Sequence, residues 1–129
     1  DEFKETPNFS CFAVNRKCYD DIGLFDEAIY PAYFEDNDYH HRIKLLGLKA
    51  TCNLGNHFFH FGSRSKLTSP LFEDYIKWRY TKNRDYYELK WGGAPDHELY
   101  TTPFNGNPPA EINITEFKDY NNELDKLNN

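Results

Sequence analysis

Aromatic side chains constrain the fold of this chain more than any other feature of its sequence. Its 129 residues include 10 Tyr, 11 Phe and 2 Trp. Disordered chains contain few such residues, and for that reason they cannot bury enough apolar surface to offset the entropy of ordering. The aromatic content of this sequence therefore predicts a folded domain. The length suits one domain with a small core. Tyr and Trp also offer flat faces with polar edges that suit a carbohydrate or another polyol, so each ring is open to two uses, core packing and ligand stacking.

Charge and hydropathy argue against two classes of protein. The chain has 15 Lys and Arg against 21 Asp and Glu, a net charge of −6, and a chain of this sign does not attract the phosphate backbone of a nucleic acid. The mean hydropathy is −0.86, and the sequence has no apolar run long enough for a transmembrane helix. We therefore expect neither a nucleic-acid partner nor a transmembrane segment.

Cysteine and methionine content bears on the origin of the chain. Its 3 Cys form no C-x-x-C motif, and an odd number excludes a complete disulfide framework. Reduced thiols and a cytoplasmic location follow as the simplest expectation. The chain has no Met, not even at position 1, which indicates a piece of a longer protein.

Three segments have the signals of helices. Asn15 is a suitable cap for a helix over residues 16–22, which Gly23 would end. The clearest helix covers residues 34–46, because acidic residues occupy its first turn and apolar residues recur along one face. A long third helix is expected over residues 71–90, either continuous or broken near positions 82 and 83.

Short runs of β-forming residues predict strands between these helices. The expected strands cover residues 9–14, 48–53 and 58–61. Together with the helices they predict an α/β fold, a small mixed sheet flanked by helices, in a domain over residues 1–93. Residues 94–129 are rich in Pro and Asn and predict an irregular tail with a short helix near residues 114–127.

Three carboxylates crowd the start of the second helix at Glu35, Asp36 and Asp38. One explanation is structural, since negative charge stabilises a helix N-terminus. The other is a general base, a carboxylate at the mouth of a cleft with a neighbour that orients it or raises its pKa. Asp36 to Asp38 also form a D-x-D pattern, but a metal-binding D-x-D belongs on a loop after a strand rather than at the start of a helix.

The segment from His57 to Ser65 is the second candidate for chemistry. Imidazole is a good ligand for Mn²⁺ or Zn²⁺, but a lone His among Phe residues is also a common core residue. On a strand, His57 and His60 would point to opposite faces and would not share a metal. A zinc site with Cys52 lacks a fourth ligand.

Together these segments resemble the C-terminal, acceptor-side half of a family 2 glycosyltransferase with the GT-A fold. That family has a G-x-F-D-E stretch, then an E-D-x-D helix with a downstream Arg and Gly, and then an H-x-G-S-x-S loop. The residues that match in this order are Gly23 to Glu27, Pro31, Tyr33 to Asp38, Arg42, Gly47 and His60 to Ser65.

The resemblance implies an inverting, metal-dependent transfer of a hexose from a nucleotide-sugar donor to an acceptor hydroxyl. Asp36 matches the catalytic base that deprotonates the acceptor. Glu35 matches an acceptor-binding position, and Asp38 would orient the helix by pairing with Arg42.

The resemblance also implies a leaving-group side of the site. His60 matches a histidine that joins the ligands of the divalent metal, Mn²⁺ or Mg²⁺, in the complete enzyme. Ser63, Arg64 and Ser65 would bind the departing diphosphate. Four further rings are open either to stacking on an acceptor sugar or to core packing: Trp78, Tyr86, Tyr87 and Trp91.

The N-terminal half of that fold, which binds the nucleotide, has no counterpart in this sequence. We therefore expect the missing half to belong to the same longer protein or to another chain, or the fragment to associate with itself through an exposed sheet edge. Two alternatives stay open: a non-catalytic carbohydrate- or protein-binding module that keeps part of the fold, and a small metal-binding or interaction domain.

Overall fold

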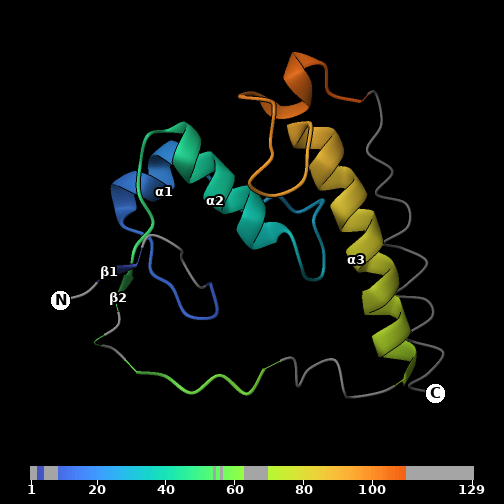
Figure 1. Cartoon of the computed structure of the whole chain (residues 1–129), viewed down its shortest axis with the longest axis horizontal. Coiled ribbons are helices and arrows are strands. Elements are labelled where there is room, and N and C mark those ends of the chain that lie inside the picture. The colour runs from blue at the N-terminus through green and yellow to red at the C-terminus, as the bar shows by residue number, and fades with distance from the viewer. Residues whose placement is uncertain (1–2, 5–8, 54, 56, 63–69, 110–129) are drawn as a thin grey trace.

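The computed structural model describes residues 3–4, 9–53, 55, 57–62 and 70–109. The elements in chain order are β1 (Phe3–Lys4), α1 (Arg16–Ile22), α2 (Glu35–Leu45), β2 (Cys52–Asn53), α3 (Pro70–Trp91) and the 3₁₀ helix η2 (Pro103–Gly106). In Figure 1, α2 lies between α1 and the much longer α3, and the segment that follows α3 returns across its C-terminal end.

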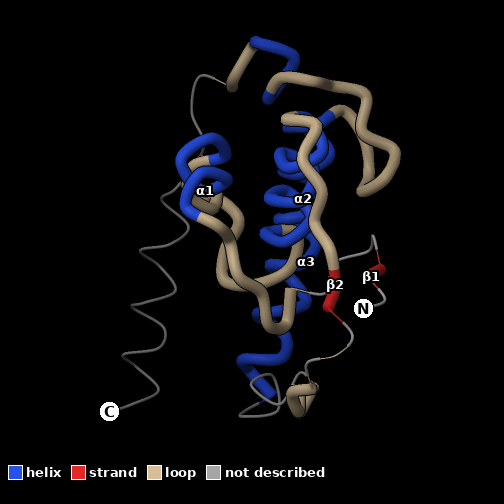
Figure 2. The backbone as a smooth tube through the Cα atoms, turned by 90° about the vertical axis from the view of Figure 1, so that its left-hand side faces the viewer, coloured by secondary structure: helices blue, strands red, loops and turns tan. Residues whose placement is uncertain are grey.

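The predicted mixed sheet is wrong for the residues that the structure describes. Their sheet is one antiparallel ladder in which Phe3 faces Asn53 and Lys4 faces Cys52, shown in red in Figure 2. The expected strand over residues 9–14 is a turn followed by irregular chain, and residues 58–61 have no regular structure. A strand needs a neighbouring strand for its ladder of hydrogen bonds, and no described strand pairs with either run. The described part of the chain is therefore helical, not α/β.

Residues 9–14 make ring contacts in place of strand contacts. The Phe9 and Phe12 rings lie 5.0 Å apart, and Phe12 also contacts Phe25 edge-on at 5.9 Å. Phe25 in turn stacks on Tyr39 of α2 at 4.5 Å. Phe12 is still 47% exposed, so these contacts cover only part of the segment.

Helix α1 confirms the expected bounds and caps. The Asn15 side chain accepts a hydrogen bond from the Cys18 N–H at 2.8 Å, and Gly23 follows the helix with a φ of 83°. The Gly23 N–H donates to the Tyr19 carbonyl at 2.8 Å. A side-chain oxygen at the N-cap and a glycine at the C-terminal end satisfy backbone groups that a short helix leaves open.

Helix α2 ends as its sequence predicts. Gly47 has a φ of 67°, and its N–H donates to the Lys44 carbonyl at 2.9 Å. The Leu48 N–H reaches back to the Ile43 carbonyl at 3.1 Å. These two bonds form a Schellman motif, which needs a left-handed residue that glycine adopts without a steric penalty.

Helix α3 is continuous through Lys82 and Asn83, where a break was one of two expectations. Beyond Trp91 the chain turns back, and the Leu99 and Tyr100 N–H groups both donate to the Trp91 carbonyl, at 3.0 and 2.9 Å. The tail is irregular with one 3₁₀ turn as far as residue 109. The helix expected near residues 114–127 lies outside the described residues.

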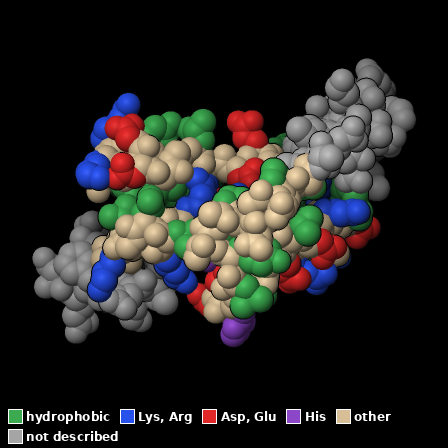
Figure 3. Space-filling model, turned by 90° about the horizontal axis from the view of Figure 1, so that it is seen from above, with side chains coloured by type: hydrophobic (Ala, Val, Ile, Leu, Met, Phe, Trp, Pro, Cys, Tyr) green, Lys and Arg blue, Asp and Glu red, His purple; other side chains and the backbone are tan. Residues whose placement is uncertain are grey.

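The core lies where α2 and α3 meet the loop between α1 and α2. Ile29, Phe34, Tyr87 and Trp91 form one buried cluster. Tyr87 and Trp91 are therefore core rings, one of the two uses that the sequence left open. Acidic, basic and hydrophobic side chains are interspersed over the face in Figure 3, and no helix within the described ranges is both long and apolar enough to cross a membrane.

Candidate active site

The residues just before α2 have an unusual backbone. Tyr33 and Phe34 have φ values of 73° and 75°, a left-handed conformation that costs a side-chain-bearing residue roughly 1–2 kcal/mol. Phe34 occupies the N-cap position but offers no side-chain cap. Two consecutive residues of this kind persist only where surrounding contacts fix them, and such strain concentrates at functional sites.

Two buried polar residues of α3 fix this loop. The Asn83 amide lies within 2.9–3.3 Å of the carbonyls of Tyr30, Ala32 and Tyr33. The Arg79 Nε donates to the Tyr30 carbonyl at 2.5 Å, and the Arg79 Nη2 donates to the Asn83 side-chain oxygen at 3.2 Å. Buried polar groups with full sets of partners define one arrangement of the chain. The loop before α2 is thus attached to the middle of α3.

A cavity of about 410 Å³ opens where this loop and the first turn of α2 face α3. Its apolar wall includes the rings of Tyr33, Phe34 and Tyr80, and its polar wall includes Asp36, Asn37, Arg84 and Glu88. Its size lies within the range of about 300–1,000 Å³ of small-molecule sites, which combine apolar walls with a few polar groups. The structure thus places Asp36 in a cavity with rings beside it.

The two carboxylates at the start of α2 have different surroundings. Asp36 lines the cavity, and its Oδ1 accepts a hydrogen bond from the Asn37 N–H at 2.8 Å. Glu35 is not among the residues that line this cavity, and its Oε2 is buried with no hydrogen-bond partner. Burial, and next the charge of Asp36, raises the pKa of Glu35. Asp36 is therefore the carboxylate with access to a ligand.

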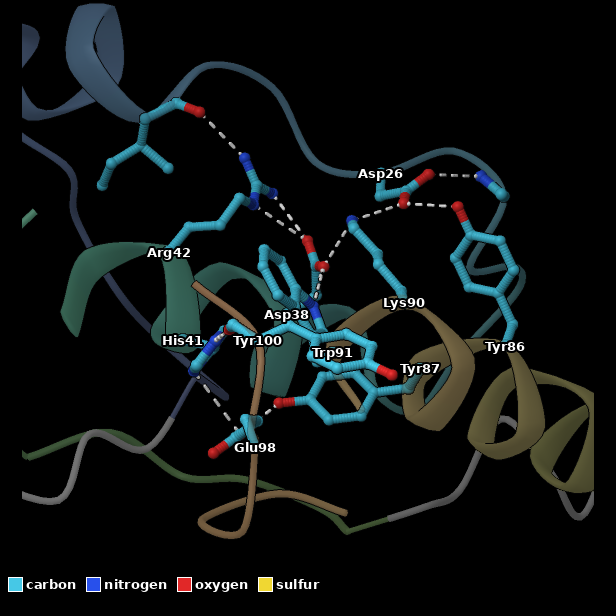
Figure 4. A network of polar contacts seen from close by, with 12 residues as sticks. Asp26, Asp38, His41, Arg42, Tyr86, Tyr87, Lys90, Trp91, Glu98 and Tyr100 are labelled. Atoms are coloured by element: carbon cyan, nitrogen blue, oxygen red, sulfur yellow. Dashed lines mark hydrogen bonds and ion pairs between the residues drawn. The ribbon is translucent and has the colours of Figure 1, made fainter. Parts of the chain in front are cut away.

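Asp38 is fully buried, in a network of charges that Figure 4 shows. Its Oδ2 accepts from the Arg42 Nε at 2.9 Å, as the spacing of four residues predicts. Its Oδ1 accepts from the Lys90 Nζ at 2.5 Å and from the Trp91 Nε1 at 2.9 Å. The Arg42 Nη1 also donates to the Ile22 carbonyl at 2.9 Å. Asp38 thus connects α2 to the end of α3 and to the end of α1.

Asp26 completes the charge balance of the network. Lys90 donates to its Oδ2 at 2.6 Å, the Tyr86 hydroxyl donates to the same atom at 2.9 Å, and the Ala28 N–H donates to its Oδ1 at 3.0 Å. Burial alone would raise the pKa of Asp26, but the Lys90 bond and charge, with the two further donors, hold that pKa below its usual value. Asp26 and Asp38 thus balance the two cations, Arg42 and Lys90.

The segment after α3 closes the other side of the core. The Tyr87 hydroxyl donates to Glu98 Oε1 at 2.5 Å, and the His41 ring of α2 lies beside both Glu98, at 3.7 Å, and the Trp91 ring. Burial favours a raised pKa for Glu98, but the bond from Tyr87 and two backbone donors lower it below its usual value. These contacts therefore join α2 to the C-terminal end of α3 and to the segment that follows it.

The acceptor-side residues predicted from sequence occupy different places. Asp36 lines the cavity, whereas Glu35 turns its Oε2 into a buried position. Trp91 is 1% exposed and holds Asp38, so its ring presents no face to solvent. Trp78 is 41% exposed on α3 and lines none of the cavities described here.

His60, the one leaving-group residue that the structure describes, is not brought to Asp36. It is exposed and belongs to the segment 57–62, which runs below α1 and α2, near the level of the N-terminal end of α3, in Figures 1 and 2. Ser63, Arg64 and Ser65 lie outside the described residues. Across the part of the chain that the structure describes, no three His, Cys, Asp or Glu residues form a group that could hold a metal. The metal role of His60 stays a prediction.

Sequence reasoning missed several residues of this site. Asn83 and Lys90 have no local signal for their long-range bonds, because the loop carbonyls that Asn83 contacts and the carboxylates that Lys90 binds lie 50 or more positions away along the chain. Tyr80, Arg84 and Glu88 recur at four-residue spacing on α3 and face the cavity. That spacing was available in the sequence, but nothing in it showed which α3 face meets Asp36.

Comparison with known proteins gives one partial similarity to report. Over 50 residues the chain is 42% identical to a protein named galactofuranosyl glycosyltransferase from Leishmania donovani. The matched segment is 39% of this chain and 12% of that relative's length. No protein-family model matches the chain, and no solved structure matches it. The similarity suggests a role in glycosyl transfer and carries no information on the fold.

Proposed function

We propose that this chain is the acceptor-binding part of a glycosyltransferase and that Asp36 is its general base. The observation that carries the proposal is the position of Asp36 in the wall of a cavity, beside aromatic rings and at the start of a helix whose next carboxylate, Asp38, is locked in the core. The partial similarity to a galactofuranosyl glycosyltransferase supports this class of reaction.

The proposed step uses the Asp36 carboxylate alone among the described side chains. An acceptor hydroxyl in the cavity gives its proton to Asp36 while its oxygen attacks the anomeric carbon of the donor. The new glycosidic bond forms as the bond from that carbon to the donor diphosphate breaks, and attack from the face opposite the diphosphate inverts the configuration. A fixed carboxylate aligned with the hydroxyl supplies both orientation and proton transfer.

The test uses the full protein that contains this chain, with nucleotide-activated galactofuranose as donor. Asp36→Asn keeps the size of the side chain and removes the base, so we expect turnover to fall by about 10²–10⁴-fold with acceptor affinity retained. Asp20→Asn, an exposed acidic residue of α1, is the matched control and should leave turnover unchanged.

Two results would contradict the proposal in different ways. Transfer by Asp36→Asn within a few-fold of the unmodified protein would remove Asp36 from the role of base. Binding of a sugar in the cavity without transfer from any activated donor would favour the alternative, a carbohydrate-binding module.

A further inference from the structure

A second cavity adjoins the one that contains Asp36. Its volume is about 470 Å³, and its walls are Tyr33, Glu73, Ile76, Lys77 and Tyr80. Tyr33 and Tyr80 line both cavities, so the two hollows are neighbours with a shared wall. Each volume alone falls in the range of about 300–1,000 Å³ that is common for small-molecule sites.

The two cavities follow one face of α3. Their α3 residues begin at Glu73 and Lys77, continue at Tyr80 and Arg84, and end at Glu88, which are spaced by three or four positions and so share a face. The distance along the helix from Glu73 to Glu88 is about 22 Å at a rise of about 1.5 Å per residue. The two neighbouring cavities, together a groove along α3, exceed the needs of a single sugar ring.

The shared wall is a pair of tyrosine rings. Tyr33 and Tyr80 meet edge to face with their centroids 5.3 Å apart, and Tyr80 also contacts Phe34 at 5.2 Å. Tyr80 is 44% exposed, so part of its ring faces solvent while its contacts hold it in place. A tyrosine fixed in this way offers an apolar face and a hydroxyl to a polyol.

Charge in the second cavity favours a neutral ligand. The Lys77 Nζ lies 3.0 Å from Glu73 and 3.6 Å from Asp74, so its positive charge is already balanced. The Asp36 side of the groove carries two carboxylates, Asp36 and Glu88, and one guanidinium, Arg84. A phosphate-bearing ligand would meet net negative charge, whereas sugar hydroxyls can bond to both the carboxylates and the ammonium group.

We infer that the acceptor is a neutral glycan of at least two sugar residues, whose terminal residue lies at Asp36 and whose next residue lies between Tyr33, Tyr80 and Lys77. This inference rests on the proposed function and adds the substrate class. The Arg79 and Asn83 bonds to the loop before α2 mean that the groove is formed before the glycan binds, so binding orders little of the protein.

The experiment compares two acceptors of the full protein, methyl galactofuranoside and the corresponding methyl digalactofuranoside. We expect kcat/KM for the disaccharide to exceed that for the monosaccharide by tenfold or more. In Lys77→Ala this preference should fall about tenfold, since hydrogen bonds to a charged group are among the stronger ones. Lys82→Ala removes an exposed lysine of the same helix that lines neither cavity and should keep the full preference.

Calorimetric binding to the Asp36→Asn protein separates this inference from the proposed function. Tighter binding of the disaccharide than of the monosaccharide supports the second sugar position even if no donor gives transfer. Equal affinities in that protein, or a preference that Lys77→Ala leaves unchanged, would overturn the inference while Asp36 could still be the base.

Discussion

Lys90 is the residue whose loss should disturb the fold most, and Lys90→Met is the sharpest test of the buried network. Its Nζ bonds to Asp38 at 2.5 Å and to Asp26 at 2.6 Å, and its side chain is 7% exposed. Methionine keeps most of the length of the side chain and removes the charge. Two carboxylates then lose a cation inside the protein, where an unbalanced charge is poorly solvated.

The bonds that Asp38 keeps in Lys90→Met determine how much unfolding free energy the variant loses. Breaking a buried ion pair by removing one partner costs about 3–5 kcal/mol. Asp38 keeps its bonds from Arg42 and Trp91, so we expect the lower end, about 3 kcal/mol. With a urea dependence of about 2 kcal/mol per molar, the unfolding midpoint would move down by about 1.5 M.

The assay is urea unfolding followed by tryptophan fluorescence, to which Trp91 contributes as a member of the network. Lys17→Met is the matched control, since Lys17 pairs with Asp21 at the same distance of 2.5 Å but its side chain is 84% exposed. We expect almost no change there, because solvent screens exposed pairs. Similar midpoints for the two variants would refute the argument that the buried charges require Lys90.

The pH dependence of Lys90→Met gives an independent check. Without Lys90, burial is the largest influence left on the pKa of Asp26 and raises it. A carboxyl whose folded pKa is raised destabilises the fold when ionised, so the deficit of Lys90→Met should be largest near neutral pH and shrink as the pH falls. A deficit that stays constant down to pH 3 would show that lost packing, not charge, is responsible.

Three further predictions concern single residues. The folded pKa of Glu98 is lowered, so its stabilising contribution should be complete only well above the ordinary Glu pKa of about 4.3, should fall as the pH drops toward the folded pKa, and should be absent in Glu98→Gln. The pKa of Glu35 is raised, so its ionised carboxylate destabilises the fold. Glu35→Gln should therefore stabilise the protein at pH 7 and give no gain at pH 3 in the same urea assay. Gly47→Ala should cost about 1–2 kcal/mol, since its φ is 67° with open space around it. Gly92→Ala, at a φ of 75°, should cost clearly more because its Cβ would lie 2.8 Å from the Tyr100 ring; equal thermal unfolding of the two would contradict this.

Local signals were sufficient to predict the helices. Asn15 and Gly23 defined α1, and Gly47 defined the end of α2, because capping depends on a few neighbouring residues. The expected strands are wrong, apart from Cys52–Asn53 within residues 48–53, for the converse reason. A run such as residues 9–14 becomes a strand only if another strand lies beside it, and the information on that partner is not within the run.

The site was predictable in part. The carboxylates at the start of α2 were visible as a cluster, and the Asp38–Arg42 pair followed from its spacing of four residues. Which carboxylate faces a cavity depends on where α3 packs. The position of α3 in turn depends on the bonds of Asn83 to the loop before α2 and of Lys90 to Asp38, which are far away in the sequence. Long-range pairing of this kind leaves no periodic pattern to read.

The left-handed backbone at Tyr33 predicts which substitutions a laboratory selection for heat tolerance would favour at this position. Tyr33→Gly would relieve the conformational penalty at that position, and heat selection would reward it. The same change would remove a ring that belongs to both hollows beside α3. Variants recovered for heat tolerance alone should therefore accumulate glycine or asparagine at this position. Under the proposed function they would lose affinity for the acceptor sugar, whereas a screen that also selects for transfer should keep the tyrosine and gain its tolerance elsewhere.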